Sequence, residues 1–175
     1  MKNIVATLSL LFATTLSAQV AIGKSSISSP AVSLEFYDGA DNARGIILPW
    51  VTSTAAVTGA VNGTLVYNTA DRKVYVKYAS GWRDLSVDNT GTVTTTLQDS
   101  LTDQDTAKVL IGGDPSTDTT PGILVLADTN KAMVLPKVAS PHLNIVNPSP
   151  GMMVYDTTKK QLAVFNGTVW SFWKP

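Results

Sequence analysis

The stretch Gly63-Thr64-Leu65-Val66-Tyr67-Asn68-Thr69 decides the fold, because its pattern recurs later in the chain at the same internal spacing. Residues 151–157 read Gly-Met-Met-Val-Tyr-Asp-Thr, and a tryptophan follows the glycine after 19 positions in both places, at Trp82 and Trp170. Glycine, tyrosine, threonine and tryptophan thus keep their offsets while most of the residues between them differ. Shared spacing indicates an internal duplication.

Both copies extend toward the N-terminus from these stretches. An Ile-Gly pair opens each copy, at residues 22–23 and 111–112, and an apolar segment closed by Leu-Pro follows, at residues 45–49 and 132–136. We therefore divide the chain into a first β module (19–86), a polar and acidic segment (87–108) and a second β module (109–175).

Each copy ends in three predicted β-strands. Residues 64–67 and 73–78 are rich in β-branched and aromatic residues and flank a polar turn, as residues 152–155 and 161–165 do, which is typical of hairpins. A third strand is expected from Trp82 and from Trp170. Short helical turns are expected after Thr52 or Ser53 and after Ser140, because these side chains can cap the start of a helix and Pro141 suits the first helical position. The predicted fold is all-β, with two tandem three-stranded meanders.

The segment between the copies allows two interpretations. Residues 87–108 are mostly polar and acidic, which favours an extended linker. Residues 92–96 are rich in threonine, and β-branched residues also suit an edge strand.

Composition excludes several classes of function. The 175 residues include 13 Lys and Arg against 13 Asp and Glu, one histidine and no cysteine. Bulk electrostatic binding of nucleic acid, disulfide frameworks, thiolate zinc sites and cysteine nucleophiles are therefore not expected. No catalytic motif with its partners can be picked out, so we expect a non-enzymatic protein without cofactor or metal.

The N-terminus resembles a targeting segment. Lys2 precedes an apolar run over residues 4–16, and Ser17-Ala18 offers a cleavage point of small residues before Gln19. Residues 1–18 are therefore predicted to be a secretory signal peptide. No later stretch reaches the roughly 20 apolar residues of a membrane span. We expect an exported protein without membrane insertion, located at the cell surface, outside the cell or in the periplasm.

Partners are expected from the size of the copies. A unit of about 60 residues buries only about 60% of its unfolded surface, and a meander leaves strand edges open. Each copy could pair with the other copy or with further chains. Homo-oligomerisation is the economical solution, and a closed ring, a trimer and a filament all satisfy it.

Aromatic side chains concentrate in the two meanders. One interpretation is core packing, since aromatic residues dominate cores and subunit contacts. The other is an exposed carbohydrate-binding platform, with Trp82 and Trp170 as equivalent stacking residues. The candidate residues for such a patch are Tyr67, Tyr78, Trp82, Tyr155, Trp170 and Trp173.

Three short stretches carry a family resemblance. They are Ala18-Gln19-Val20-Ala21-Ile22-Gly23 after the leader, Gly45-Ile46-Ile47-Leu48-Pro49, and the run from Gly63 to Trp82. The pattern resembles secreted proteins of the Bacteroidetes and the shaft and head regions of phage tail-fibre-like proteins. Trp50 stands where those proteins carry an arginine after Leu-Pro. The resemblance implies a homotrimeric structural or adhesive component whose partners are copies of itself, other surface proteins or glycans.

The resemblance also points to O-glycosylation. Four Asp-Ser or Asp-Thr steps are similar to the sites that exported Bacteroidetes proteins can carry. The candidate acceptors are Ser100, Thr106, Thr119 and Thr157.

Overall fold

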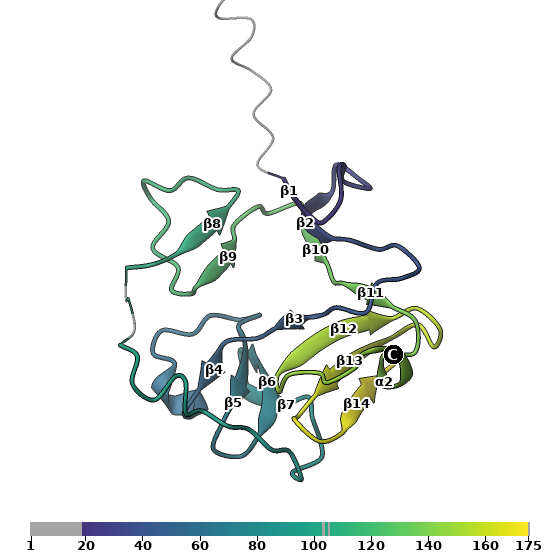
Figure 1. The fold of residues 1–175 in the computed structure, drawn as a ribbon. Helices are drawn as coiled ribbons and strands as arrows, with labels where there is room; N and C mark the ends of the chain where they lie inside the picture. The colour runs from purple at the N-terminus through teal and green to yellow at the C-terminus, as the bar shows by residue number, and fades with distance from the viewer. Residues whose placement is uncertain (1–18, 103, 105, 175) are drawn as a thin grey trace, which may run out of the picture.

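The computed structural model describes residues 19–102, 104 and 106–174, and nearly all its regular structure is β (Figure 1). In the described residues, helical structure is confined to the 3-10 turn η1 (Thr54–Ala56) and the one-turn helix α2 (Pro141–Asn144). The all-β prediction is confirmed.

Both halves of the chain contain the same series of elements. In the first half they are β1 (Val20–Ile22), β2 (Val32–Phe36), β3 (Ile46–Ile47), β4 (Trp50–Val51), η1, β5 (Leu65–Asn68), β6 (Lys73–Tyr78) and β7 (Gly81–Asp84). In the second half they are β8 (Val109–Ile111), β9 (Leu124–Leu126), β10 (Ala132–Val134), β11 (Lys137–Val138), α2, β12 (Met152–Asp156), β13 (Gln161–Phe165) and β14 (Trp170–Trp173). The predicted meander strands are all present, with ends shifted by one residue at most.

Equivalent elements pair in the same way. β5, β6 and β7 form an antiparallel meander with β4 parallel to β5, and β12, β13 and β14 form the same arrangement with β11. The registers agree as well, because Trp50 lies opposite Tyr67 in one copy and Lys137 lies opposite Tyr155 in the other. β1 and β2 form a parallel pair, as β8 and β9 do, also in the same register.

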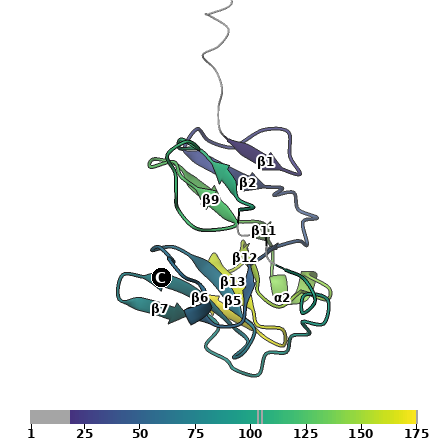
Figure 2. The same cartoon turned by 90° about the vertical axis from the view of Figure 1, so that its left-hand side faces the viewer.

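Two strands cross between the copies. β3 of the first copy pairs antiparallel with β12 of the second, with Ile46 opposite Met153. β10 of the second copy pairs parallel with β2 of the first, with Met133 opposite Leu34. The copies, although consecutive in sequence, are therefore interleaved in space. Figure 2 shows the group around β1, β2 and β9 standing above the two meanders.

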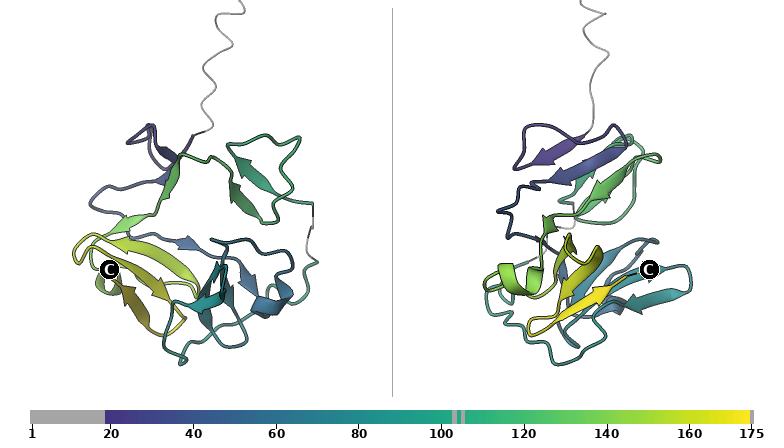
Figure 3. Two further views of the ribbon diagram at one scale, coloured as in Figure 1. Left: turned by 180° about the vertical axis from the view of Figure 1, so that it is seen from behind. Right: turned by 90° about the vertical axis from the view of Figure 1, so that its right-hand side faces the viewer.

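The main core lies between the two meanders, which are seen as blue and yellow-green strands side by side in Figure 3. Both copies contribute to it, and burial of each large apolar side chain stabilises the fold by about 1.5–3 kcal/mol. Its buried members are Leu48, Tyr67, Val74, Leu85, Met153 and Val164. A second cluster belongs wholly to the second copy and consists of Val138, Ile145, Met152, Val154, Ala163 and Phe165.

Matching turns connect the first two strands of each meander. The Asn68 side-chain oxygen accepts a hydrogen bond from the Ala70 N–H at 3.0 Å, and Asp156 Oδ1 accepts one from the Thr158 N–H at 2.9 Å. Arg72 and Lys160 close these turns with φ values of 63° and 56°, in the left-handed region.

The short helices lie where the sequence predicts them. The Ser53 side chain caps η1 by accepting a hydrogen bond from the Ala56 N–H at 3.1 Å. The prediction that Ser140 caps α2 with its side chain is wrong, because its hydroxyl donates to Thr158 Oγ1 instead.

The segment between the copies contains no strand at residues 92–96, so the edge-strand alternative is not realised. Its first part is not a free linker either. Gly91 is buried, and Val93 packs against the main core.

Candidate functional site

The candidate functional site is the interface between the two copies, where strands and side chains of both copies meet. At its centre, the Leu48 N–H donates a hydrogen bond to the Gly151 carbonyl at 3.1 Å, beside the β3–β12 pairing. The backbones approach so closely that a Cβ atom on Gly45 would lie 2.6 Å from Val154 Cγ1 and 3.0 Å from the Met153 carbonyl oxygen. The residue directly before β3, at position 45, therefore has to be small.

Two aromatic side chains of the first copy reach into the second. Trp50 Nε1 donates to the Pro150 carbonyl at 2.9 Å, and the Tyr67 hydroxyl donates to the Asn166 carbonyl at 2.8 Å. Tyr67 also covers Gly151, where an added Cβ would lie 2.8 Å from the Tyr67 Cβ. Burial raises the pKa of Tyr67 to about 12. Tyr67 is therefore a neutral hydrogen-bond donor at physiological pH.

The last strand of the second copy lies against the end of the first meander. Trp173 Nε1 donates to the Leu85 carbonyl, and the Ser171 hydroxyl donates to the Ser86 carbonyl. The Arg83 guanidinium lies 5.5 Å from the centre of the Trp173 ring, within the range of a cation–π contact.

The segment after β7 extends this contact. Asn166 Nδ2 donates to Asp88 Oδ1 at 3.1 Å, and Thr92 Oγ1 donates to the Gly167 carbonyl at 3.0 Å. Residues 88–92 thus run alongside the turn between β13 and β14.

A buried ion pair supports the second crossing, in which β10 lies beside β2. Glu35 is fully buried on β2 opposite Val134, and it accepts hydrogen bonds from the Ser28 N–H at 2.7 Å and from Lys24 Nζ at 2.9 Å. The Ser28 N–H, aided by Lys24, holds the pKa of Glu35 below its usual value despite burial. Asp38 joins Lys24 and Lys137 by ion pairs of 3.1 and 3.3 Å.

The six candidate aromatic residues do not share an environment. Tyr67 has no exposed surface, so its ring belongs to the core and cannot stack on a ligand. Tyr78 and Tyr155 are 46% and 36% exposed, whereas the candidate tryptophans are half-buried.

Trp82 and Trp170 lie on opposite sides of the two-meander body. Trp82 lies opposite Lys77 in the sheet, on the face that points away from Val76 and the main core. Trp170 lies opposite Phe165, and its ring is 5.3 Å from that ring, in the second cluster. Each tryptophan is thus on the outer face of its own meander, and the two do not form one flat platform.

The four candidate glycosylation residues, Ser100, Thr106, Thr119 and Thr157, are all exposed. Asp105, which precedes Thr106, lies outside the described residues, as does the predicted signal peptide.

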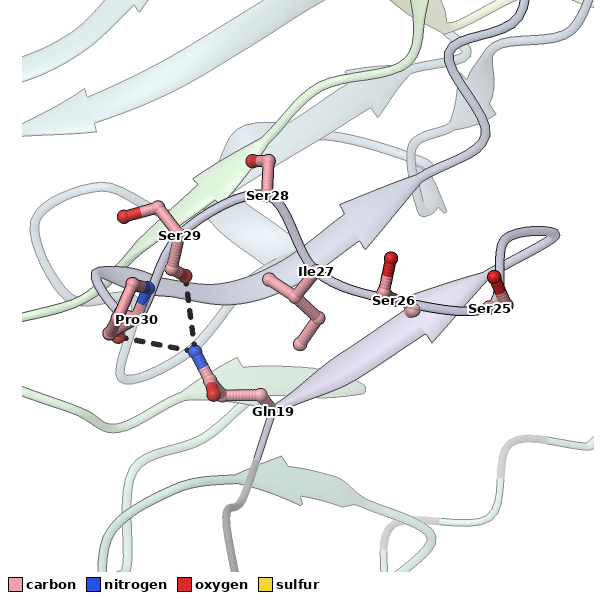
Figure 4. Close-up of a pocket in the computed structure, with 8 residues that line it drawn as sticks. Gln19, Ser25, Ser26, Ile27, Ser28, Ser29 and Pro30 are labelled. Atoms are coloured by element: carbon pink, nitrogen blue, oxygen red, sulfur yellow. Dashed lines mark hydrogen bonds between the residues drawn. The ribbon is translucent and has the colours of Figure 1, made fainter.

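A shallow hollow of about 510 Å³ lies beside the loop between β1 and β2 (Figure 4). Its walls are serines, Gln19 and apolar groups, and Gln19 Nε2 donates to the carbonyls of Ser29 and Pro30. The eight residues that line it carry no ionisable side chain. It therefore offers hydroxyl and amide groups but no acid–base pair.

The described part of the chain meets the requirements of neither a membrane-spanning helix nor a metal site formed by its own side chains. No helix there is long and apolar enough to cross a membrane. Residues 19–102, 104 and 106–174 also contain no group of three or more side chains suited to hold a metal ion.

The second copy is similar to a known family. Residues 114–174 match the family described as the phage tail like trimerisation region. This segment contains β9 to β14, which is nearly all of the second copy. No curated protein and no solved structure matches the chain. The match supports the similarity to phage tail-fibre-like proteins.

Proposed function

We propose that the chain is an exported, non-enzymatic structural component that assembles as a homotrimer and serves in adhesion at the cell surface. The observation that carries the proposal is the match of residues 114–174 to a trimerisation region. This region coincides with the copy that already binds a neighbouring copy within the chain.

Open apolar strand edges give the proposal a physical basis. β9 pairs with β8 on one side only, and Ile123 and Leu124 beside this edge are 65% and 47% exposed. Ile47 on β3 and Val109 on β8 are also more than half exposed. Edges of this kind favour pairing with another chain.

Export is proposed from the leader alone. Residues 1–18 have the charge, apolar run and small-residue cleavage point of a signal peptide. The mature chain would then begin at Gln19, directly before β1.

Light scattering of residues 19–175 during size-exclusion chromatography, over a range of concentrations, tests the proposed assembly. We expect a particle of three times the chain mass. A particle that keeps the mass of one chain at every concentration would refute the homotrimer.

A further inference from the structure

Two strand pairings join the copies, β3 with β12 and β10 with β2, and both relate the first copy to the second in the same direction. The first copy gives β3 to the edge of β12, and it receives β10 along the edge of β2. A symmetric two-fold pair would also place β10 on β5 and β3 on β9, because these strands are the equivalents of β12 and β2. Neither pairing is present in the described sheets. The copies are therefore related head to tail.

A head-to-tail contact leaves one unused surface at each end of the chain. The open head belongs to the second copy and consists of the free edges of β9 and β10. The open tail belongs to the first copy and consists of the outer edge of β3 and the N-terminal part of β5. Both surfaces are apolar, since Leu124 of the head is 47% exposed and Ile47 of the tail is 53% exposed.

The N-terminal part of β5 has no partner strand on its outer edge among the described residues. Along β12 the edge is shared, with β11 opposite Tyr155 and Asp156 and β3 opposite Met152 and Met153. Along β5 only the first half of this arrangement exists, with β4 opposite Tyr67 and Asn68. Leu65, the equivalent of Met153, pairs with Val76 of β6 but has no strand on its other side among the described residues.

One tyrosine–glycine pair distinguishes the used interface from the unused one. Gly151 has φ +78° and is covered by Tyr67 of the first copy. Its equivalent Gly63 has φ +91°, and an added Cβ there would meet no atom within 4 Å. Tyr155, the equivalent of Tyr67, is 36% exposed. The glycine and the tyrosine of an equivalent contact, Gly63 and Tyr155, are thus both present on one chain, but they do not touch each other.

We propose that the open head of one chain binds the open tail of a second copy, and that this contact repeats the one between β3 and β12. By equivalence, β10 adds to β5 with Met133 opposite Leu65 and Val134 opposite Thr64. The incoming β3 adds to β9 with Ile46 opposite Leu124 and Ile47 opposite Val125, and Tyr155 covers Gly63. This inference rests on the proposed homo-oligomer and names the surfaces that form it.

The proposed contact allows a small number of chains to form a closed ring. Each chain has one head and one tail, so successive chains form either a ring or an open filament. Closure after three chains gives a trimer with three identical chain-to-chain contacts and no open head or tail. An oligomer of this kind pairs the free edges of β3, β5, β9 and β10.

Disulfide cross-linking tests the predicted register, since the chain has no cysteine of its own. Leu48 and Gly151 form a hydrogen-bonded pair, so the neighbouring positions Ile47 and Met152 form a non-hydrogen-bonded pair. Cα atoms in such a pair are about 4.5 Å apart, which a disulfide can bridge. The equivalent positions across the proposed contact are Thr64 and Val134.

Thr64→Cys and Val134→Cys chains with different tags are to be co-expressed and oxidised. Because each chain carries a single cysteine, a bond between the two kinds of chain must join two chains. We expect a covalent dimer carrying both tags that disappears on reduction. Ile47→Cys with Val125→Cys tests the β3–β9 register in the same way and serves as a second pair if either first variant fails to fold.

Two controls define the outcome. Ile47→Cys and Met152→Cys within one chain should give an intrachain bond, which shows that the equivalent geometry cross-links. Ala70→Cys with Val134→Cys should give no mixed dimer, because Ala70 lies in the exposed turn at the opposite end of β5 from Thr64. The doubly substituted chain carrying both Thr64→Cys and Val134→Cys should stop at a covalent trimer if the ring closes.

The proposed function and this inference fail in different ways. Light scattering that finds a trimer, together with absence of both cross-links and a positive intrachain control, would overturn the head-to-tail contact and leave the trimer in place. A persistent monomer would overturn both. A ladder of covalent species beyond three chains would support the contact and refute closure after three.

Discussion

Replacement of Tyr67 by phenylalanine tests whether the two copies are joined by a specific buried hydrogen bond. The Tyr67 hydroxyl is fully buried and donates to the Asn166 carbonyl at 2.8 Å, across a sequence separation of 99 residues. In the described part of the chain this carbonyl accepts from Tyr67 alone. Tyr67→Phe keeps the ring and its packing but leaves a buried acceptor unsatisfied, which costs about 1–3 kcal/mol.

Equilibrium unfolding in urea, followed by tryptophan fluorescence, measures this loss. Trp50 and Trp173 lie on either side of the contact between the copies, so their emission reports its separation. Tyr67→Phe should lower the midpoint without a change in the slope, because the surface exposed on unfolding is nearly the same. All variants must be compared at one chain concentration, since association adds to apparent stability.

Tyr78→Phe is the matched control, because this tyrosine is 46% exposed and its hydroxyl has no hydrogen bond in the described structure. We expect its free energy of unfolding to stay within about 0.5 kcal/mol of the parent. An equally small change for Tyr67→Phe would refute the conclusion that this hydroxyl joins the copies.

Three further changes test buried contacts of the fold. Gly45→Ala places a Cβ 2.6 Å from Val154 Cγ1, and we expect the displaced β3 to cost about 1–3 kcal/mol in urea unfolding; a stability equal to the parent's would show that β3 does not lie this close to β12. The pKa of Glu35 is held low by the Ser28 N–H and Lys24, and that of Asp156 by backbone N–H groups that outweigh its burial. Stability should therefore fall as the pH drops below their ordinary values of 4.5 and 3.8, and Glu35→Gln should show a smaller fall; an identical acid profile would contradict this. The pKa of Tyr67 is raised from 10.0 to about 12, so stability should decline as the pH rises through that interval, and less so in Tyr67→Phe; equal alkaline profiles of thermal unfolding would argue against it.

Local structure could be predicted from the sequence because its signals are short in range. The hairpins flank polar turns, and β6 and β13 have the predicted limits, Lys73–Tyr78 and Gln161–Phe165. The duplicated spacing also predicted that equivalent strands form equivalent meanders. These features depend on neighbours within about twenty residues, which periodicity can detect.

The interleaving of the copies could not be predicted in this way. β3 contains only Ile46 and Ile47, and its partner strand begins more than 100 residues later, at Met152. A two-residue strand has no periodicity to read, and the sequence of its edge does not specify which distant edge it meets. The same holds for β10, whose pairing with β2 depends on the final arrangement of both meanders.

The aromatic residues show where the sequence is ambiguous about a site. Tyr67 and Tyr155 have the same residue type and the same place in their copies, yet one is fully buried and the other is 36% exposed. This difference in burial arises only because the first copy packs onto the second, which covers Tyr67 and not Tyr155. Trp50 is a signal that could have been used, since it replaces the arginine of the related pattern and donates to Pro150 across the interface.

The two equivalent interfaces should also differ in strength. Trp50 fills the contact between the copies, but its equivalent Lys137 is a charged side chain paired with Asp38. The contact inside the chain joins segments that are already covalently linked, so the effective concentration of its halves is high. The proposed contact between chains has a lysine in place of the indole and gains nothing from a linker. The proposed assembly should therefore depend on chain concentration, whereas the pairing of the two copies within a chain should not.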